Sequence, residues 1–423
     1  MEGLPLCFMS RSAAAPRPSL LPILLLSAAG FTILTTEFII VGLLPAMARD
    51  LQVTIPQAGL LVTLFAFTVA VVGPPLTAYL ARFERRRLFV ITLLLFALAN
   101  GLAAAAPNIG VMSLARFIPA VMLPVFWALA SETAVNITGP AKSGQAIFLV
   151  SFGIVVATIF GIPVGTLVSD AFGWRTAFGA LAVLSLAKAL LLYRFLPVIS
   201  LPGNPVTVTR QMAILRNPVI LGHVLLSTLV FGGMFTTYTY LADILERLAG
   251  YDGTTVGWCL MGFGAVGLLG NWVCGRLVDK RPLGITLLFG TPMVVAMLIL
   301  IPLVHTYLPL ASVLAVWGIC QAGLFTGSHV RVMKAASESP ALGASLNISG
   351  ANIGIGLGAM LGGWVMKAYG LEKVGIAGSV VIGLALALTL VLTRMPPTGR
   401  VKHPGKENGE KGLSPAPCVN CEP

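Results

Sequence analysis

Long apolar stretches of about 20 residues constrain the fold of this chain more than any other feature of its sequence. A helix of that length crosses the hydrocarbon core of a bilayer, which is roughly 30 Å thick. Only 10% of the residues are charged, compared with about 25% in an average soluble protein. The period-two alternation of a membrane β-barrel is absent. We therefore predict an all-α membrane protein.

The apolar stretches predict twelve transmembrane helices in two six-helix halves. The predicted spans are residues 20–45, 56–80, 87–106, 110–135, 145–168, 176–196, 218–242, 255–278, 283–303, 308–330, 341–366 and 372–394. The longest internal connector follows the sixth span and contains the Pro and Gly residues typical of loops. The predicted parts are a cytoplasmic N-terminal tail (1–19), an N-terminal half (20–196), a cytoplasmic connector (197–217), a C-terminal half (218–394) and a disordered cytoplasmic tail (395–423).

Lysine and arginine residues predict the orientation of the helices. Of the 27 in the chain, 20 lie on the side of the two termini, including Arg331 just after the tenth span, and five lie on the opposite side. Because cytoplasmic loops carry the excess of positive charge, we expect both termini in the cytoplasm and the protein in a cell inner membrane. The net charge of +12 then reflects topology, and nucleic acid is not an expected partner. We expect a monomer whose partners are the lipid bilayer and a small-molecule substrate.

Ionisable residues within the predicted spans are the first functional candidates. Such a side chain costs roughly 2.5–3.5 kcal/mol at the centre of a spanning helix, so its presence usually indicates function. Glu37 in the first span and Arg116 in the fourth lie at similar depth, and neighbouring helices would allow them to pair. The pair could exchange a proton or could simply fix helix packing. Glu132 is expected near the head groups or in a proton relay, and Lys188 faces either lipid or another helix.

Polar and aromatic side chains within the spans are the candidate substrate contacts. Thr236 and Tyr240 lie four residues apart and therefore share a helix face. The predicted cavity residues are Phe126, Trp127, Thr236, Tyr240, Asn347 and Asn352. A mostly apolar pocket with these few polar groups suits a small amphipathic solute, whereas the alternative for each residue is a place in the helix core.

Glycines in two spans predict close helix packing. Four glycines of the eleventh span recur every four residues, which is typical of a packing face: Gly350, Gly354, Gly358 and Gly362. In the fifth span, Gly161, Pro163 and Gly165 predict either a bend that serves as a hinge or plain tight packing.

Several motifs resemble those of the major facilitator superfamily, and together they cover nearly the whole chain. The loop of residues 275–280 resembles the cytoplasmic loop signature of that family. Residues 81–87 resemble a degraded first copy, in which Ala81 stands where the signature has an acid. Residues 114–117, which include Arg116, resemble the fourth-helix arginine motif.

Two further motifs resemble the exporters of this family. Residues 161–165, followed by Gly173, Trp174 and Arg175, resemble the fifth-helix pattern of exporters. Residues 36–45 resemble the first helix of the drug/proton antiporter branch. The resemblance implies two halves that rock against each other and a proton-coupling role for Glu37 and Arg116. It also implies gating or hinge roles for Arg85, Arg86, Gly161, Pro163, Gly165, Gly275 and Asp279.

Topology and resemblance together predict a proton-coupled antiporter that exports a small amphipathic solute, with a chloramphenicol-like drug as the first candidate. The alternatives are sugar or purine-nucleoside efflux, proton-coupled import on the same fold, and a non-transporting membrane receptor or scaffold. The proton gradient would supply the energy, and we expect no cofactor and no enzyme activity. The sequence has no phosphate-binding loop and no nucleophile–base pair, and Cys418 and Cys421 supply only half of a four-ligand metal site.

Overall fold

The computed structural model describes residues 20–80, 82–138, 149–150, 152–154, 156–198, 217–336 and 340–394. These residues form helices and turns without a β-strand, and twelve helical stretches are long and apolar enough to cross a membrane. The predicted fold class is therefore confirmed. The predicted tails (1–19 and 395–423) and most of the connector (197–217) lie outside the described residues.

The helices follow the predicted spans closely. In chain order the elements are α1 (Leu21–Asp50), α2 (Ile55–Leu80), α3 (Arg85–Ala104), α4 (Ile109–Thr138), η2 (Ala157–Gly161), α6 (Ile162–Phe172), α7 (Trp174–Phe195), α9 (Pro218–Tyr238), α10 (Leu241–Asp243), η3 (Ile244–Leu248), α11 (Gly253–Leu277), α12 (Pro282–Ile299), α13 (Tyr307–Ala335), α14 (Pro340–Tyr369), η4 (Leu371–Lys373) and α15 (Val374–Arg394).

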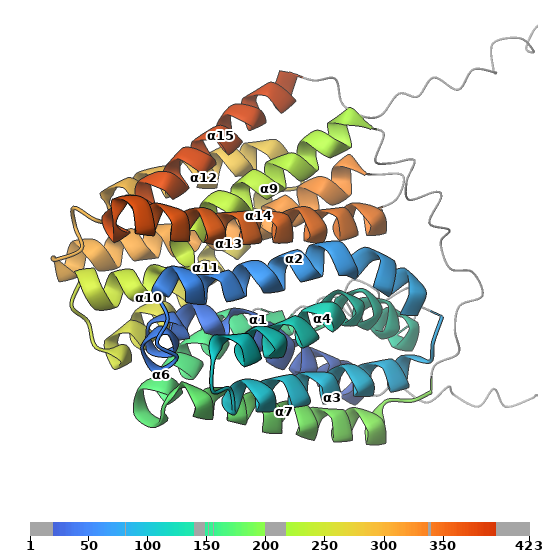
Figure 1. Cartoon of the computed structure of the whole chain (residues 1–423). Coiled ribbons are helices and arrows are strands. Elements are labelled where there is room, and N and C mark those ends of the chain that lie inside the picture. Colours follow the sequence, from blue (N-terminus) through green and yellow to red (C-terminus); the bar gives the residue numbers. More distant parts are fainter. Residues whose placement is uncertain are drawn as a thin grey trace, which may run out of the picture.

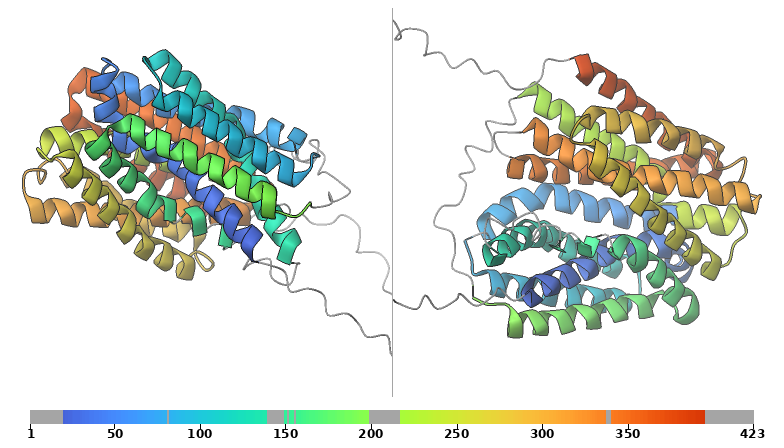
Figure 2. Two further views of the ribbon diagram at one scale, coloured as in Figure 1. Left: turned by 90° about the horizontal axis from the view of Figure 1, so that it is seen from below. Right: turned by 180° about the vertical axis from the view of Figure 1, so that it is seen from behind.

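The helices lie side by side in two groups, the N-terminal half (α1–α7) and the C-terminal half (α9–α15), which are stacked in Figure 1. The halves meet where α2 lies along α14 and where α6 lies along α11. The view from behind shows the same division (Figure 2).

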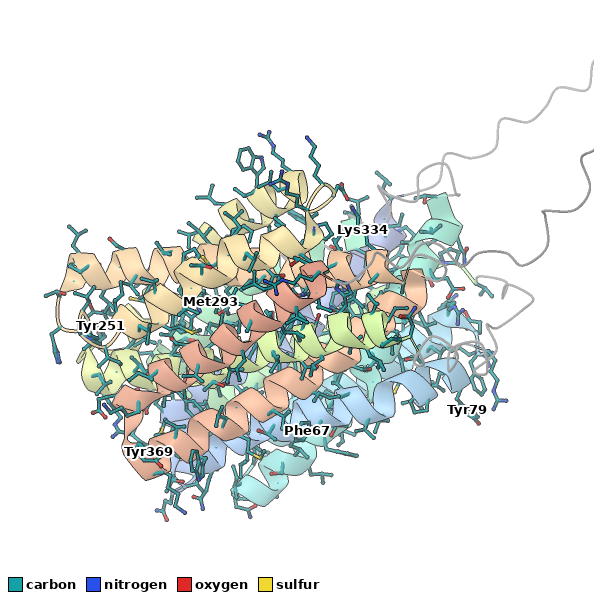
Figure 3. The ribbon with its side chains drawn as sticks, turned by 90° about the horizontal axis from the view of Figure 1, so that it is seen from above. Phe67, Tyr79, Tyr251, Met293, Lys334 and Tyr369 are labelled. Atoms are coloured by element: carbon teal, nitrogen blue, oxygen red, sulfur yellow. The ribbon has the colours of Figure 1, made fainter. Side chains whose placement is uncertain are left out.

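The two ends of the bundle are named here by one residue each. The Arg49 end holds the last turn of α1, and Tyr251 and Tyr369 mark it in Figure 3. The opposite end is the Lys334 end, where Tyr79 also lies (Figure 3). Because α1 runs toward the Arg49 end and α15 runs away from it, the first and last described helices both have their free ends at the Lys334 end.

Polar residues fix where several apolar helices begin. Glu84 accepts hydrogen bonds from two main-chain N–H groups in the first turn of α3, at 2.9 and 3.0 Å. Asn217 and Asp252 cap α9 and α11 in the same way, at 3.0 Å each. The first N–H groups of a helix have no partner within it, and these side-chain oxygens satisfy them.

The seventh span differs from its predicted range, 218–242. Helix α9 ends at Tyr238, and the chain turns through Thr239 and Tyr240 before it continues as α10 and the π-helix η3. The charge of Asp243 ends the apolar pattern in the sequence. In the folded chain, however, Ile244 and Leu245 beyond it are fully buried, so the span continues to Leu248.

The tenth span also runs further than predicted. Arg331 was expected in a connector, but it lies within α13 and is only 1% exposed. It donates a hydrogen bond to the Ser227 hydroxyl of α9 at 2.8 Å. Hydropathy alone cannot place this residue, because a bonded arginine inside a bundle and a solvated arginine after a helix have the same sequence pattern.

Candidate functional site

The structure brings Glu37 and Arg116 together in the interior of the N-terminal half. Their side chains are 8% and 1% exposed, respectively. The guanidinium of Arg116 donates to the main-chain carbonyl of Glu37 at 2.7 Å and to that of Thr36. It also lies over the ring of Phe65 on α2, 4.4 Å from the ring centroid. Arg116 therefore binds the α1 backbone beside the carboxyl group.

The carboxyl group of Glu37 has no hydrogen bond or ion pair with any other described residue. Arg116 in turn has no ion pair with a carboxylate of the described chain, and its Nε is buried without a partner. The arrangement thus holds a fixed positive charge close to a carboxyl group that has no hydrogen-bond or ion-pair partner among the described residues. This free carboxyl group is the central feature of the candidate site.

A row of polar contacts continues along α1 from this point. Asn100 of α3 donates to the Thr36 hydroxyl at 3.1 Å, and Thr36 donates to the Thr32 carbonyl at 2.9 Å. Lys188 of α7 donates to the Thr32 hydroxyl and lies over the ring of Phe31, 5.1 Å from its centroid. Lys188 therefore contacts a neighbouring helix, one of the two positions considered for it. Asn100 belongs to this row, although its sequence context gave no sign of a role.

The two predicted aromatic cavity residues occupy different positions. Phe126 is fully buried in the core of the N-terminal half, with its ring centroid 5.5 Å from that of Phe89. Trp127 is partly exposed and packs over Gly30 of α1. Gly30 and Glu37 are seven residues apart, so they share a face of α1. Trp127 therefore lies on the Glu37 face, two helical turns away.

The predicted cavity residues of the seventh span, Thr236 in α9 and Tyr240 in the turn after it, both have hydrogen-bond partners. Thr236 is fully buried and donates to the Gly232 carbonyl within its own helix at 2.7 Å. The Tyr240 hydroxyl donates to the Ala359 carbonyl of α14 at 2.8 Å. The Thr236 hydroxyl is thus bonded within α9 and the Tyr240 hydroxyl is bonded to α14, and their predicted role toward a solute stays a prediction.

The two asparagines of α14 are held in different ways. Asn347 is 3% exposed and accepts a hydrogen bond from the Ser227 hydroxyl at 2.8 Å, next to Arg331. Asn352 donates to the Ile348 carbonyl at 2.9 Å, and its Oδ1 is buried without a partner. Of the two, Asn352 retains an unused acceptor.

Glycines form the tightest helix contacts in each half. Four of the glycines of α14 face the seventh span, where an added Cβ would meet the α9 backbone or nearby side chains, and this confirms the predicted packing face of Gly350, Gly354, Gly358 and Gly362. Gly161 lies against Thr35 and Gly165 against Ile39, both on α1. The π-helix η2 ends two residues before Pro163, which has no N–H to continue regular α-helical bonding. The structure therefore places an irregular turn at the predicted hinge.

The predicted gating loops both pair with the fourth helix of their own half. Buried Arg85 at the start of α3 forms an ion pair with Glu132 of α4 at 3.0 Å. Asp279, after α11, pairs with Lys334 of α13 at 2.7 Å. The basic partner thus lies at the loop in the N-terminal half and on the helix in the C-terminal half. Arg86 stacks on Tyr193 of α7, at 4.6 Å from the ring centroid, and a side chain at Gly275 would meet open space.

At the Arg49 end, the last residue of α1 is bonded to the first two residues of α7. Asp50, the last residue of α1, accepts hydrogen bonds from the Trp174 indole at 3.0 Å and from the Arg175 guanidinium. Gly173 has φ +85°, a conformation that glycine adopts easily, and it allows the chain to turn from α6 into α7. This clamp fixes the end of the helix that carries Glu37.

The two halves touch one another toward the Arg49 end. Among the described residues, the polar contacts between the halves are Arg49 with Glu246, Thr254 with Asp170 at 2.6 Å, and the Thr63 hydroxyl with the Gly356 carbonyl at 3.1 Å. The rings of Phe38 and Phe235 also meet across the halves, with centroids 5.6 Å apart. These contacts join the two halves near the Arg49 end.

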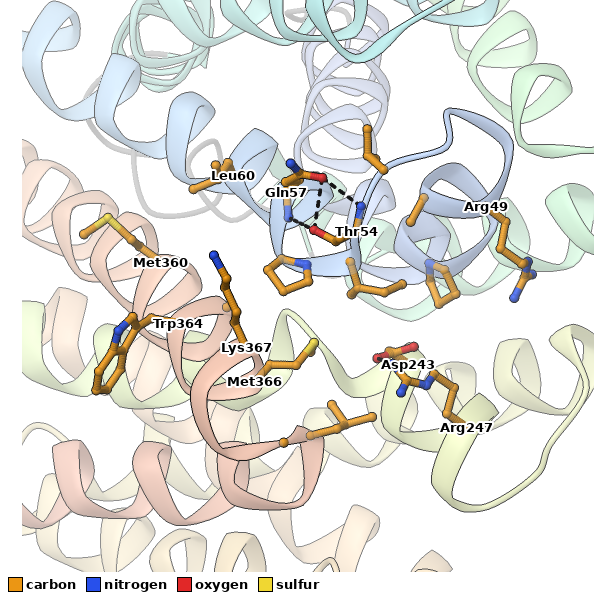
Figure 4. A pocket seen from close by; sticks show the side chains of 18 of the residues that line it. Arg49, Thr54, Gln57, Leu60, Asp243, Arg247, Met360, Trp364, Met366 and Lys367 are labelled. Carbon is orange, nitrogen blue, oxygen red and sulfur yellow. Dashed lines mark hydrogen bonds and ion pairs between the residues drawn. The ribbon is translucent and has the colours of Figure 1, made fainter.

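A cavity of about 920 Å³ opens on that end, between α1 and α2 of one half and α10 and α14 of the other. Figure 4 shows Arg49 on one side, Asp243 and Arg247 on the other, and the Lys367 side chain extending from α14 toward α2. Asp243 is a residue that sequence reasoning missed, because the seventh span was expected to end just before it. The apolar residues Ile244 and Leu245 beyond it were the available signal.

Comparisons with known proteins agree with this architecture. The sequence profile of the Major Facilitator Superfamily matches residues 26–344. The chain is 33% identical over 377 residues to the inner membrane transport protein YdhP of Escherichia coli K12, covering 89% of this chain and 97% of that one. It is 31% identical over 362 residues to a probable sugar efflux transporter of Pasteurella multocida, covering 85% and 89%, respectively.

Solved structures show the same fold. A bacterial homolog of the human lysosomal transporter Spinster, in an inward-facing and occupied conformation, superposes with a TM-score of 0.72 at 18% identity, over 90% of this chain and 98% of that one. A variant of the nucleoside transporter NupG gives a TM-score of 0.68 at 15% identity, over 88% and 99%. The chain belongs to the Major Facilitator Superfamily and is a multi-pass membrane transporter.

Proposed function

We propose that this protein is a proton-coupled antiporter that exports a small amphipathic organic solute from the cytoplasm. The observation that carries this proposal is the buried Glu37 carboxyl group, which has no partner among the described residues and lies beside the fixed charge of Arg116. A carboxyl group without a permanent partner can bind a proton in one state of the transporter and release it in another.

Arg116 has a positioning role in this proposal. Because it is anchored on two carbonyls of α1, it moves with Glu37 when the halves move. Its charge therefore acts on the carboxyl group throughout the cycle. A solute or a conformational change that admits or removes water at Glu37 then decides when the proton leaves.

The orientation follows from the distribution of basic residues. The Lys334 end carries most of the lysines and arginines of the connectors, so we assign it to the cytoplasm and the Arg49 end to the outside.

The solute class has two candidates. The first is the chloramphenicol-like group expected from the sequence resemblance. The second is a sugar, which is favoured by the 31% identity to a protein named as a probable sugar efflux transporter. A nucleoside and proton-coupled import remain the further alternatives on this fold.

The test uses purified protein in liposomes with an imposed pH gradient and an internal pH-sensitive dye. Chloramphenicol-like drugs, pentoses, hexoses and nucleosides are added one at a time. We expect one compound to change the dye signal in the parent protein, and we expect this response to be lost in Glu37→Gln. Glu410→Gln, the same acid-to-amide change beyond the last helix, is the matched control and should respond like the parent. Full proton movement in Glu37→Gln would contradict the mechanism.

A further inference from the structure

Asp243 lies at an interrupted part of the seventh span that the Glu37 mechanism does not use. The chain turns at Thr239 and Tyr240, forms the three-residue α10, and continues as the π-helix η3. Interruptions and π-turns within helices are frequently found at functional sites. Asp243 is the last residue of α10, so its side chain projects from this irregular backbone.

The Asp243 side chain is completely buried and only partly satisfied. Its exposed fraction is 0%, and its Oδ2 lies 3.4 Å from Nη1 of Arg247. Its Oδ1 is buried without any hydrogen-bond partner. The side chain of Arg247 is itself 59% exposed, so the cation that is paired with this carboxyl group lies mostly in solvent.

The charged and titratable groups around Asp243 come from both halves. On its own segment these are Tyr240, Glu246 and Arg247. Arg49 approaches from α1, where it forms the ion pair with Glu246 that joins the two halves. Across the same cavity lie Lys367 of α14 and Glu372 of η4, whereas α2 contributes the uncharged residues Ile55, Pro56, Gln57 and Leu60 (Figure 4).

We propose that Asp243 is a second proton-binding carboxyl group, and that proton binding there stabilises the closed form of the Arg49 end. Closure of this end removes water from Oδ1 and supplies no donor in its place. The hydration free energy that is lost in this way is larger for an ionised carboxylate than for a neutral carboxyl group. Closure and proton binding at Asp243 therefore favour one another by linkage.

This mechanism adds an outer proton site to a cycle in which Glu37 lies deeper. When the halves separate at the Arg49 end, water reaches Asp243 and the proton can leave. The inference rests on the proposed function only in assuming that this end opens during transport, and it does not depend on the role of Glu37.

The test measures opening of the Arg49 end without any solute. Ala171 at the end of α6 and Ala368 at the end of α14 are exposed alanines in opposite halves. After the native cysteines are replaced, both positions are changed to cysteine and spin-labelled in lipid nanodiscs. Distance distributions are then recorded by pulsed electron resonance at pH values between about 5.5 and about 8, and one linked proton changes the ratio of open to closed protein by up to ~10-fold per pH unit.

In the parent background we expect the fraction of long distances to increase by at least about threefold from the lowest to the highest pH. Asp243→Asn, which mimics the protonated group, should keep the short distance of the low-pH parent at every pH. That short distance also shows that the variant is folded, because a misfolded protein would not reproduce it. Glu37→Gln should retain the pH response of this end.

Two results would overturn the inference. The first is a parent distribution that does not change with pH. The second is a full pH response in Asp243→Asn, particularly if Glu37→Gln abolishes it. Neither result bears on solute-driven proton movement, so failure here and failure of the Glu37 mechanism remain distinguishable.

Discussion

Arg116 donates a hydrogen bond to the main-chain carbonyl of Glu37, at 2.7 Å, and forms no ion pair with its carboxylate. A guanidinium can hold two acceptors at once through its fixed fork of donors, and Arg116 holds the carbonyls of Thr36 and Glu37 in this way. The charge is therefore fixed to the α1 backbone, and the carboxyl group stays available.

This relationship predicts that Arg116→Lys is not a conservative change. A single ammonium cannot hold both carbonyls, so the position of α1 relative to α4 should loosen. We expect proton-driven export of the identified solute to fall roughly 10- to 100-fold, as misplacement of about 1 Å can cause. Arg276→Lys, at an exposed arginine stacked on Trp272, is the control and should remain active. Undiminished export by R116K would show that charge alone is sufficient.

The ion pairs Arg85–Glu132 and Lys334–Asp279 should contribute differently to the free energy of unfolding. Glu132→Gln removes the carboxylate that is paired with Arg85, whose side chain is only 3% exposed, so this change should cost on the order of 1–3 kcal/mol. Asp279→Asn breaks a pair whose side chains are 38% and 74% exposed, and it should cost less than about 1 kcal/mol. Thermal unfolding midpoints in detergent compare the two variants. Equal losses would contradict the difference in burial.

Replacement of glycine by alanine should have different effects on stability at Gly354 of α14 and at Gly383 of α15. A Cβ at Gly354 would overlap the Thr228 carbonyl of α9, and backbone cannot move aside as a side chain can. Gly354→Ala should therefore lower the unfolding midpoint clearly. A Cβ at Gly383 of α15 would meet nothing within 4 Å, so Gly383→Ala should be neutral or should stabilise by up to about 1 kcal/mol. A neutral Gly354→Ala would mean that α9 and α14 pack less closely than described.

Lys188 should be replaceable by methionine without loss of the fold. Its ammonium has no acidic partner among the described residues and contacts only the Thr32 hydroxyl and the Phe31 ring. A cation within a span is costly, whereas methionine keeps the length of the side chain. We expect the unfolding midpoint of Lys188→Met to be unchanged or a few degrees higher, with exposed Lys280→Met as the control. A large decrease confined to Lys188→Met would show that the ammonium stabilises the polar row of α1.

The fold could be predicted from the sequence because its main determinant is local. Each apolar stretch must form a helix in the bilayer to satisfy its own backbone, whatever its neighbours are. The glycine face of α14 was predicted for the same reason, since four-residue spacing puts small residues on one side of any helix. The seventh and tenth spans ended too early in the prediction because Asp243 and Arg331 are charged. Hydropathy scores each residue by its type alone, so it cannot show that a charged side chain is buried against another helix.

The sequence by itself determined the twelve helices, the resemblance to the transporter family and the presence of Glu37 and Arg116 within spans. Only the tertiary structure decided what each polar group touches: Arg116 binds main-chain carbonyls, and Asp243 lies buried at the seam. Helix formation depends on neighbours a few residues apart, which a sequence displays directly. Hydrogen bonds and burial depend on atoms from distant helices, and the positions of those atoms are set only when the halves pack.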